Sequence, residues 1–371
     1  MAAKRIRIGI IFGGRSGEHD VSLTSAHAIL NHIDTQRFEP VLIGITRTGE
    51  WVTGGDPLRQ LARTSRLPLP EYAEAASASG DRSSDVSPYG QSEQLRDRGD
   101  TSWVQDLDVV FPVLHGPMGE DGTVQGMLDL AGIPYVGSGV LGSAVAMDKV
   151  TAKRLFEQAG LPVGPWVSFV RRDWQRNPAE VSERIAREVG YPCFVKPSNM
   201  GSSVGVYKVH DPAELGDAID GAAHFDRRLV AEAAIDAREL EVSVLGNDDP
   251  ISSVVGEVVP GHEFYDYEAK YVDDSSELHV PANITPEISD EVRRIALRAF
   301  KLLDCEGMAR VDMFLERSTN RVLINEVNTI PGFTPISMYP KLWEATGIPF
   351  GELISRLVEL AIERHDERYF R

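Results

Sequence analysis

Three short oxygen-bearing side chains near the end of the sequence have types and spacing suited to metal chemistry. Asp312 lies toward the end of Gly307–Leu315, which is predicted to be a strand. Glu326 ends a second predicted strand, Arg321–Glu326, and Asn328 lies in the loop after it. If the two strands pair, the three side chains converge. Magnesium takes oxygen ligands from one or two carboxylates and completes its shell with phosphate oxygens and water, so this pattern predicts phosphoryl chemistry on a nucleotide.

A glycine- and serine-rich loop supplies parts that could bind phosphate. Lys196 ends a predicted strand and precedes Gly201, Ser202, Ser203 and Gly205. Backbone N–H groups in such a loop can approach an anion closely, and a lysine adds a point charge. The lysine precedes the glycines, whereas a Walker A loop carries it after them, so a P-loop kinase or ATPase is not predicted. A polar hairpin turn is the alternative interpretation.

Polar residues also follow two strands predicted in the first part of the chain. Glu18 comes after Arg5–Phe12, and His115 comes after Asp108–Leu114. In open α/β sheets, ligands bind beyond the carboxyl ends of the strands. Glu18 could hold a substrate ammonium there, although acidic residues at helix N-termini need no function. A lone histidine is more often structural than catalytic.

The elements that must position these residues alternate as strand and helix through the first part, the pattern of a mostly parallel sheet. Residues 53–101 interrupt the pattern with small and polar residues, which predicts a variable surface excursion. The G-x-G-x-x-G stretch at Gly137–Gly142 lacks an acidic residue about 20 positions later, so we interpret it as a turn leading into a helix. The other predicted elements are the helices Val21–Ile33, Thr123–Ala131, Met147–Ala159, Pro212–Ala223, Pro286–Leu303, Tyr339–Ala345 and Phe350–Glu363, and the strands Glu39–Thr46, Pro134–Val136, Trp166–Val170, Tyr191–Lys196, Leu229–Glu232, Glu239–Leu245 and Ile251–Val259.

Bulk composition limits the class of protein. A length of 371 residues favours two or three domains, and 42% hydrophobic with 25% charged residues is ordinary for a soluble globular protein. The formal charge of −18 argues against nucleic acid as a partner. Cys193 and Cys305 fit buried thiols in a reducing compartment, and no stretch approaches the roughly 20 apolar residues of a membrane span. We therefore expect a cytoplasmic protein without a membrane partner.

Seven motifs in a fixed order resemble the D-alanine–D-alanine ligases of the ATP-grasp superfamily. They are Gly-Gly-x-Ser-x-Glu-x-x-Val-Ser, His-Gly-x-x-Gly-Glu-Asp-Gly, Met-Asp-Lys, Lys-Pro-x-x-x-Gly-Ser-Ser-x-Gly, Tyr-Glu-Ala-Lys-Tyr, Arg-x-Asp and Glu-x-Asn-x-x-Pro-Gly. The resemblance extends to about Ile354 and implies an α/β protein, α+β in its ATP-binding part, with a three-domain ATP-grasp fold. The implied units are a Rossmann-like parallel-sheet domain (1–139), a central ATP-grasp subdomain (140–233) and a C-terminal subdomain (234–371) with a lid loop and the metal site.

The resemblance also implies a role for each motif residue. By that similarity ATP is bound by Lys149, Lys196, Ser202, Ser203, Glu232, Ile235, Glu239 and Lys270, and two magnesium ions by Asp312, Glu326 and Asn328. The implied catalytic residues are Glu18, Ser202, Tyr271, Arg310 and Ser337. The implied substrate-binding residues are Glu18, His115, Gly332, Ser337 and Met338.

The activity that follows from the resemblance is ATP-dependent joining of two D-alanine molecules for peptidoglycan synthesis, through an acyl phosphate and with release of ADP and phosphate. Manganese is expected to substitute for magnesium, activation by potassium stays open, and a homodimer through the first domain is expected. Preference for D- over L-alanine rests on the resemblance alone. The alternatives are D-lactate or D-serine as second substrate, another ATP-grasp carboxylate–amine ligase, and a nucleotide-binding regulator without turnover.

Overall fold

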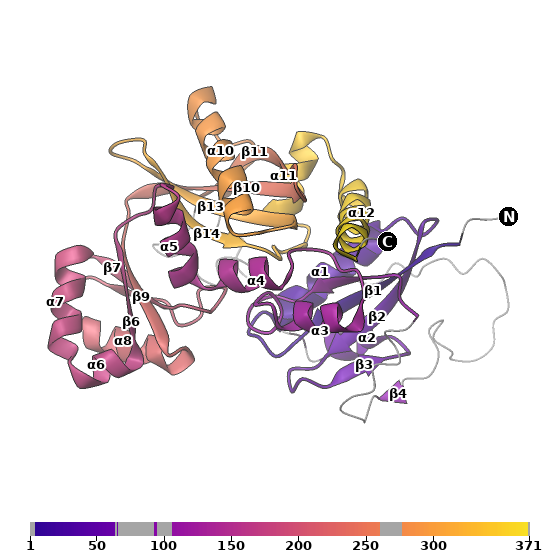
Figure 1. The fold of residues 1–371 in the computed structure, drawn as a ribbon, viewed down its shortest axis with the longest axis horizontal. Helices are drawn as coiled ribbons and strands as arrows, with labels where there is room; N and C mark the ends of the chain where they lie inside the picture. The colour runs from indigo at the N-terminus through magenta and orange to yellow at the C-terminus, as the bar shows by residue number, and fades with distance from the viewer. Residues whose placement is uncertain (1–3, 64, 66–92, 95–105, 260–276, 370–371) are drawn as a thin grey trace.

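The computed structural model describes residues 4–63, 65, 93–94, 106–259 and 277–369. These residues form three sheets, each with helices packed against it (Figure 1). The α/β fold expected from the sequence is confirmed. No helix in the described ranges combines the length and apolar character needed to cross a membrane.

The first sheet has the strand order β4-β3-β2-β1-β5 and contains the buried apolar strands of the N-terminal part. Strands β1, β2 and β5 are parallel, while β3 and β4 are antiparallel additions at one edge. The expected surface excursion is wrong at its start, because Leu58 and Leu61 are buried in a short helix. The strands of this first sheet and the helices around it are β1 (Ile6–Gly13), α1 (His19–His32), β2 (Phe38–Ile45), β3 (Trp51–Thr53), α2 (Pro57–Ala62), β4 (Glu93–Gln94), β5 (Val109–Val113) and α3 (Thr123–Ala131).

The second sheet is antiparallel, in the order β6-β9-β7-β8. Three helices pack against it around a core that includes Val181, Ile185 and Ile219. Two of them, α6 and α7, were not predicted, although Val181 and Ile185 have the four-residue spacing of a helix face. Its elements are β6 (Trp166–Val170), α6 (Arg171–Arg176), α7 (Pro178–Glu188), β7 (Cys193–Pro197), β8 (Tyr207–Val209), α8 (Leu215–Phe225) and β9 (Arg228–Ala233).

The third sheet, in the order β12-β11-β10-β13-β14, contains the strands of the predicted metal site. Val242 on one face packs in a cluster with Phe156 of α5 (Lys149–Gln158) and Phe300 of α10. Ser243 points to the other face, where its hydroxyl donates to the carbonyl of Tyr339 in α11. Its elements are β10 (Ala237–Gly246), β11 (Ile251–Val259), β12 (Glu277–His279), α10 (Pro286–Leu302), β13 (Gly307–Glu316), β14 (Val322–Asn328), α11 (Met338–Thr346) and α12 (Phe350–Tyr369).

The segment between the first and second sheets contains two helices, α4 (Val140–Met147) and α5 (Lys149–Gln158). The helix predicted over residues 147–159 is confirmed as α5, which begins two residues later than predicted because α4 ends just before Asp148. Asp148 has extended backbone, and its side chain accepts from the Thr151 N–H as an N-cap. Lys149 therefore stands at the first position of a helix. The turn into a helix that we expected at Gly137–Gly142 is confirmed, since α4 follows Gly139 directly.

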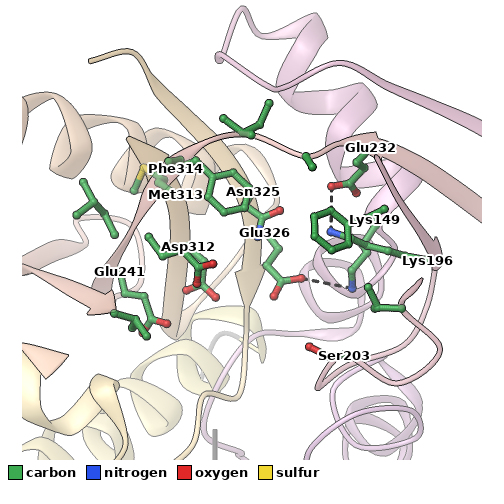
Figure 2. A pocket seen from close by; sticks show the side chains of 18 of the residues that line it. Lys149, Lys196, Ser203, Glu232, Glu241, Asp312, Met313, Phe314, Asn325 and Glu326 are labelled. Atoms are coloured by element: carbon green, nitrogen blue, oxygen red, sulfur yellow. Dashed lines mark hydrogen bonds and ion pairs between the residues drawn. The ribbon is translucent and has the colours of Figure 1, made fainter. Parts of the chain in front are cut away.

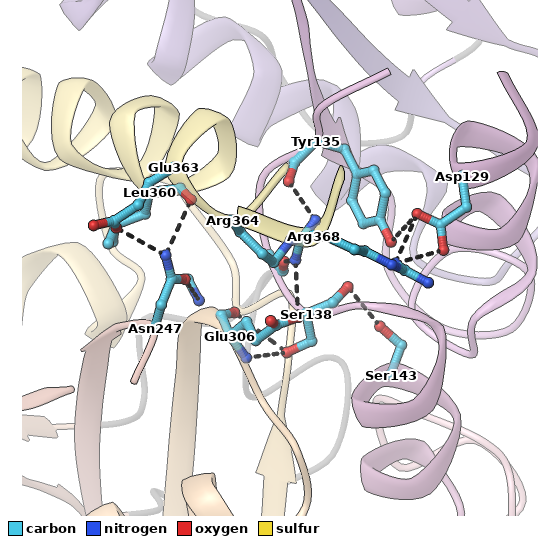
Figure 3. Close-up of polar contacts among 12 residues, drawn as sticks. Asp129, Tyr135, Ser138, Ser143, Asn247, Glu306, Leu360, Glu363, Arg364 and Arg368 are labelled. Carbon is cyan, nitrogen blue, oxygen red and sulfur yellow. Dashed lines mark hydrogen bonds and ion pairs between the residues drawn. The ribbon is translucent and has the colours of Figure 1, made fainter. Parts of the chain in front are cut away.

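Helix α12 joins the first and third sheets through a buried arginine, Arg364 (Figure 3). Its guanidinium donates to the carbonyls of Tyr135 and Gly137 and lies 3.3 Å from Glu306 Oε2. The same group lies 4.4 Å from the centre of the Tyr135 ring. We call this cluster the Arg364 joint. It ties the segment that leaves the first sheet to the start of β13.

Candidate active site

The strands β13 and β14 bring the three predicted metal ligands together. Asp312 pairs with Glu326 in the antiparallel register, and Arg310 pairs with Asn328. The Arg310 guanidinium donates to both oxygens of Asp312, each at 2.7 Å, and Asn328 Nδ2 donates to Asp312 Oδ2 at 3.0 Å. Asn328 lies within β14 and not in a following loop, because the strand continues two residues beyond the predicted end.

The donor set suits a metal ion whose shell is shared with a ligand. No group of three or more His, Cys, Asp or Glu in the described ranges could hold a metal ion. Asp312, Glu326 and Asn328 offer two carboxylates and an amide. Magnesium commonly binds through one or two carboxylates and completes its octahedron with phosphate oxygens and water. The residues therefore fit magnesium bridging to a phosphate, and not a closed protein cage.

A cavity of about 350 Å³ lies beside this cluster, between the second and third sheets (Figure 2). Lys149 Nζ lies 3.4 Å from Glu326 Oε2, and Lys196 Nζ lies 3.1 Å from Glu232 Oε2. Most of the predicted nucleotide-binding residues line this cavity: Lys149, Lys196, Ser202, Ser203, Glu232, Ile235 and Glu239. Lys270 and the implied catalytic residue Tyr271 lie outside the described residues.

The lysines and carboxylates of this cavity hold one another in their charged forms. Burial disfavours the charge on Lys196, but Glu232, Glu326 and Glu239 outweigh burial and raise its pKa. Burial likewise disfavours the charge on Glu232, but nearby lysines outweigh it and lower the pKa of that carboxyl. The cavity thus presents fixed positive and negative groups at neutral pH.

The glycine- and serine-rich loop joins this cavity to the first sheet. Ser202 and Ser203 have φ of 46° and 60°, the left-handed region that residues other than glycine rarely adopt. Such strain costs about 1–3 kcal/mol per residue and concentrates at ligand-binding sites. The Ser202 hydroxyl donates to the buried carboxylate of Glu18, which lies just before α1. Glu18 and Ser202, both among the implied catalytic residues, are therefore joined by a hydrogen bond.

A second cavity of about 80 Å³ lies on the side of the first sheet. All the predicted substrate-binding residues line it: Glu18, His115, Gly332, Ser337 and Met338. His115 Nδ1 donates to the Ile330 carbonyl at 3.0 Å, and its Nε2 has no hydrogen-bond partner in the described part of the chain. Burial lowers the pKa of His115, so the ring is neutral near pH 7 and Nε2 is an acceptor.

Two glycines leave room for the polar side chains of this second cavity. A Cβ on Gly332 would lie 2.7 Å from Ser337 Oγ, and a Cβ on Gly201 would lie 3.0 Å from Glu18 Oε2. Both distances are shorter than ordinary contact. Glycine is needed at these positions because the backbone approaches the functional oxygens closely.

Comparison with known proteins identifies the family. A model described as the D-ala D-ala ligase N-terminus matches residues 7–138, and one described as the D-ala D-ala ligase C-terminus matches residues 155–359. The chain belongs to the D-alanine–D-alanine ligase family. The D-alanine–D-alanine ligase of Acetivibrio thermocellus is 46% identical over 370 residues, covering 97% of each chain. That of Geobacillus kaustophilus is 47% identical over 364 residues, covering 98% of this chain and 96% of the relative.

Solved structures of this ligase family have the same fold. The D-alanine-D-alanine ligase from Coxiella burnetii is 34% identical, with a TM-score of 0.79 and coverage of 99% of this chain and 97% of that one. The VanG D-Ala:D-Ser ligase from Enterococcus faecalis is 35% identical, with a TM-score of 0.80 and coverage of 96% and 100%. The ATP-grasp fold expected from the sequence is therefore confirmed.

The ligase site also contains residues that were not predicted to have a role. Glu120 lines the smaller cavity and accepts from the Gly116 N–H at 2.7 Å; burial and the nearby Glu18 raise its pKa to about 8. Glu241 lies 3.0 Å from Arg310 across β10 and β13. Both residues could have been predicted from the sequence. Glu120 lies inside the motif His-Gly-x-x-Gly-Glu-Asp-Gly, and Glu241 lies two residues after Glu239, on the same face of the strand.

Proposed function

We propose that this chain joins two D-alanine molecules in a reaction that converts ATP to ADP and phosphate. The observation that carries the proposal is the adjacency of the two cavities. Gly201, Ser202 and Glu326 line both, so the nucleotide side and the amino-acid side share a wall. A D-alanine molecule bound near Glu18 would thus lie within reach of a phosphate held by Lys149 and Lys196.

The chemistry requires this adjacency. A carboxylate resists attack by an amine because oxide is a poor leaving group. A carboxylate oxygen of the first D-alanine attacks the γ-phosphorus, the bond to ADP breaks, and an acyl phosphate forms. The amine nitrogen of the second D-alanine then attacks the carbonyl carbon, and phosphate leaves with the oxygen. Such reactions depend mainly on positioning and on opposing charge.

The charged residues divide this work. Glu18 orients the ammonium of the first D-alanine, while Lys149 and Lys196 hold phosphates. Arg310 opposes the negative charge that develops on the tetrahedral intermediate. Asp312, Glu326 and Asn328 would hold magnesium, for which manganese can substitute; when bound, the metal neutralises phosphate charge. We leave potassium activation as an open part of the proposal.

The direct test compares the two alanine enantiomers. The purified protein is incubated with ATP, magnesium and either D-alanine or L-alanine, and the product is identified by mass. We expect a dialanine peptide with D-alanine, one phosphate per peptide, and little product with L-alanine. Binding of ATP without phosphate release in the presence of D-alanine would favour a regulator without turnover.

The second substrate is the least constrained part of the proposal. A solved relative of almost the same fold is titled a D-Ala:D-Ser ligase, so D-serine is a specific alternative acceptor. Ser337 and Met338 line the small cavity and would contact the acceptor side chain. A competition assay with D-alanine, D-serine and D-lactate decides between them. We expect dipeptide of D-alanine to dominate, and dominant D-lactate incorporation at neutral pH would overturn this choice.

We also propose three structural units and a homodimer. The units are residues 1–139, 140–233 and 234–371, each built around one sheet. Exposed leucines support association near the end of the first unit, because Leu130 of α3 is 93% exposed and Leu141, at the start of the second unit, is 60% exposed. Light scattering of the protein and of Leu130→Glu tests this: a dimer that becomes a monomer is expected, and a monomeric parent protein would contradict it. Use of ATP supports a cytoplasmic location.

A further inference from the structure

A second lysine of α5 lies behind the larger cavity and has no role in the reaction as described so far. Lys153 follows Lys149 by four residues, so both side chains leave the same face of the helix. The Lys153 side chain is 4% exposed, and its Nζ lies 3.5 Å from Glu232 Oε2. Lys153 is not among the residues that line the cavity. Among the described residues, its ion pair with Glu232 links it to the lining of the cavity.

One carboxylate oxygen of Glu232 contacts two lysines, whereas the other has no hydrogen-bond partner among the described residues. Lys196 Nζ and Lys153 Nζ both approach Oε2, at 3.1 and 3.5 Å. Its buried Oε1 has no hydrogen-bond partner among the residues that the structure describes. Glu232 lines the cavity, so a nucleotide donor could complete this oxygen.

Nucleotide binding would remove one of these two cations from Glu232. In the proposed function Lys196 turns to the phosphates. A buried carboxylate that loses its cation is strongly destabilised, because desolvation is no longer offset by charge attraction. Lys153 does not line the cavity, so it is not placed to follow Lys196 to the phosphates. It is the cation that remains.

We propose that Lys153 is a positioning residue for nucleotide binding: it keeps the Glu232 carboxylate charged and in place after Lys196 has engaged the phosphates. This inference rests on the proposed function. In it, Lys153 acts on the nucleotide site through Glu232. The pKa values agree with such a pair, since burial lowers the pKa of Lys153 while Glu232 opposes that change. Each charge is thus maintained by the other.

A double-mutant cycle with Lys153→Met and Glu232→Gln tests the proposal. The dissociation constant of ATP is measured by calorimetry for the parent protein, each single variant and the double variant. We expect Lys153→Met to weaken ATP binding about 10- to 100-fold. In this variant the buried Glu232 carboxylate would lose its remaining lysine partner once Lys196 has turned to the phosphates. In the Glu232→Gln background the same substitution should change the constant by less than about twofold, because a neutral amide needs no cation.

Other readouts separate this role from a merely structural one. Lys301→Met removes an exposed lysine of α10 and serves as the matched control, with an unchanged ATP constant. The KM for D-alanine should stay unchanged in Lys153→Met while the KM for ATP rises. An equal loss of ATP affinity in both backgrounds, or no loss at all, would overturn the proposal.

Two further outcomes are decided in advance. If Lys153→Met does not fold, the double variant is compared with Glu232→Gln. A double variant that folds and has the same dissociation constant for ATP as Glu232→Gln supports the pairing. A double variant that does not fold overturns it. If the parent protein itself binds no ATP, the proposed function fails, whatever Lys153 does.

Discussion

The Arg364 joint and the cluster around Glu232 are buried to the same extent, but their polar atoms are satisfied to different degrees (Figures 2 and 3). Arg364 is 8% exposed and Glu232 is 7% exposed. In the joint, Arg364 binds two carbonyls and a carboxylate, and Asn247 accepts from the Gly307 N–H while donating to the Leu360 carbonyl. Within the described residues, no side chain of this network has a buried polar atom without a hydrogen-bond partner.

The site lacks this completeness. Glu232 Oε1 and His115 Nε2 have no hydrogen-bond partners within the ranges that the structure describes. A buried polar atom left without a partner costs about 1–3 kcal/mol. The polar groups of the joint stabilise the fold, whereas the site holds groups that a ligand would complete. Substitutions in the two regions should therefore have opposite signatures.

The largest expected effect is in the site. Glu326→Gln should lower turnover by at least about 100-fold, because a charged metal ligand is lost, while the unfolding temperature changes by less than about 3 °C. Phosphate release with D-alanine and thermal unfolding measure the two quantities. Near-normal turnover would remove Glu326 from the metal site and weaken the contrast with the joint.

In the joint the signature should be reversed. Arg364→Met should reduce the free energy of unfolding by about 3 kcal/mol, because the Tyr135 and Gly137 carbonyls and Glu306 lose their partner. KM values for ATP and D-alanine should stay near those of the parent protein wherever the variant is folded. Urea unfolding measures the loss. The control is Arg356→Met on the same helix, whose exposed ion pair with Glu352 is expected to contribute less than about 0.5 kcal/mol.

A smaller effect is expected on the pH dependence of stability. Burial and Glu18 raise the pKa of Glu120 from 4.5 to about 8, so the folded protein retains a proton that the unfolded chain releases. The stability contributed by this proton is fully present below about pH 4.5 and is lost as the pH rises toward about 8. Glu120→Gln should gain stability relative to the parent protein across that window. Thermal unfolding of both proteins at a series of pH values measures the difference, and parallel curves would contradict it.

Much of the fold was predictable because its apolar patterns are local. The predicted bounds of Thr123–Ala131 and Ile251–Val259 agree with α3 and β11. The motifs also brought most site residues to the right cavity. The helix predicted to begin at Met147 begins at Lys149, because the Asp148 side chain caps it by accepting from the Thr151 N–H, a contact that the apolar pattern does not reveal.

The unpredicted parts of the site depend on contacts between distant segments. Lys153 is an ordinary lysine in an amphipathic helix until Glu232, from a strand of the second sheet, lies beside it. Glu120 acquires its raised pKa from burial and from Glu18, which comes from a different loop. No local pattern contains these distances. They follow from the packing of the sheets against one another.

The central claim is that a D-alanine carboxylate attacks ATP in the joined cavities, and isotope transfer tests it most directly. D-Alanine labelled with ¹⁸O in both carboxylate oxygens is supplied with ATP and magnesium, and the released phosphate and peptide are analysed by mass. The account predicts one ¹⁸O in each phosphate and three in each dipeptide. Unlabelled phosphate would show that water attacks the nucleotide, and would contradict the account.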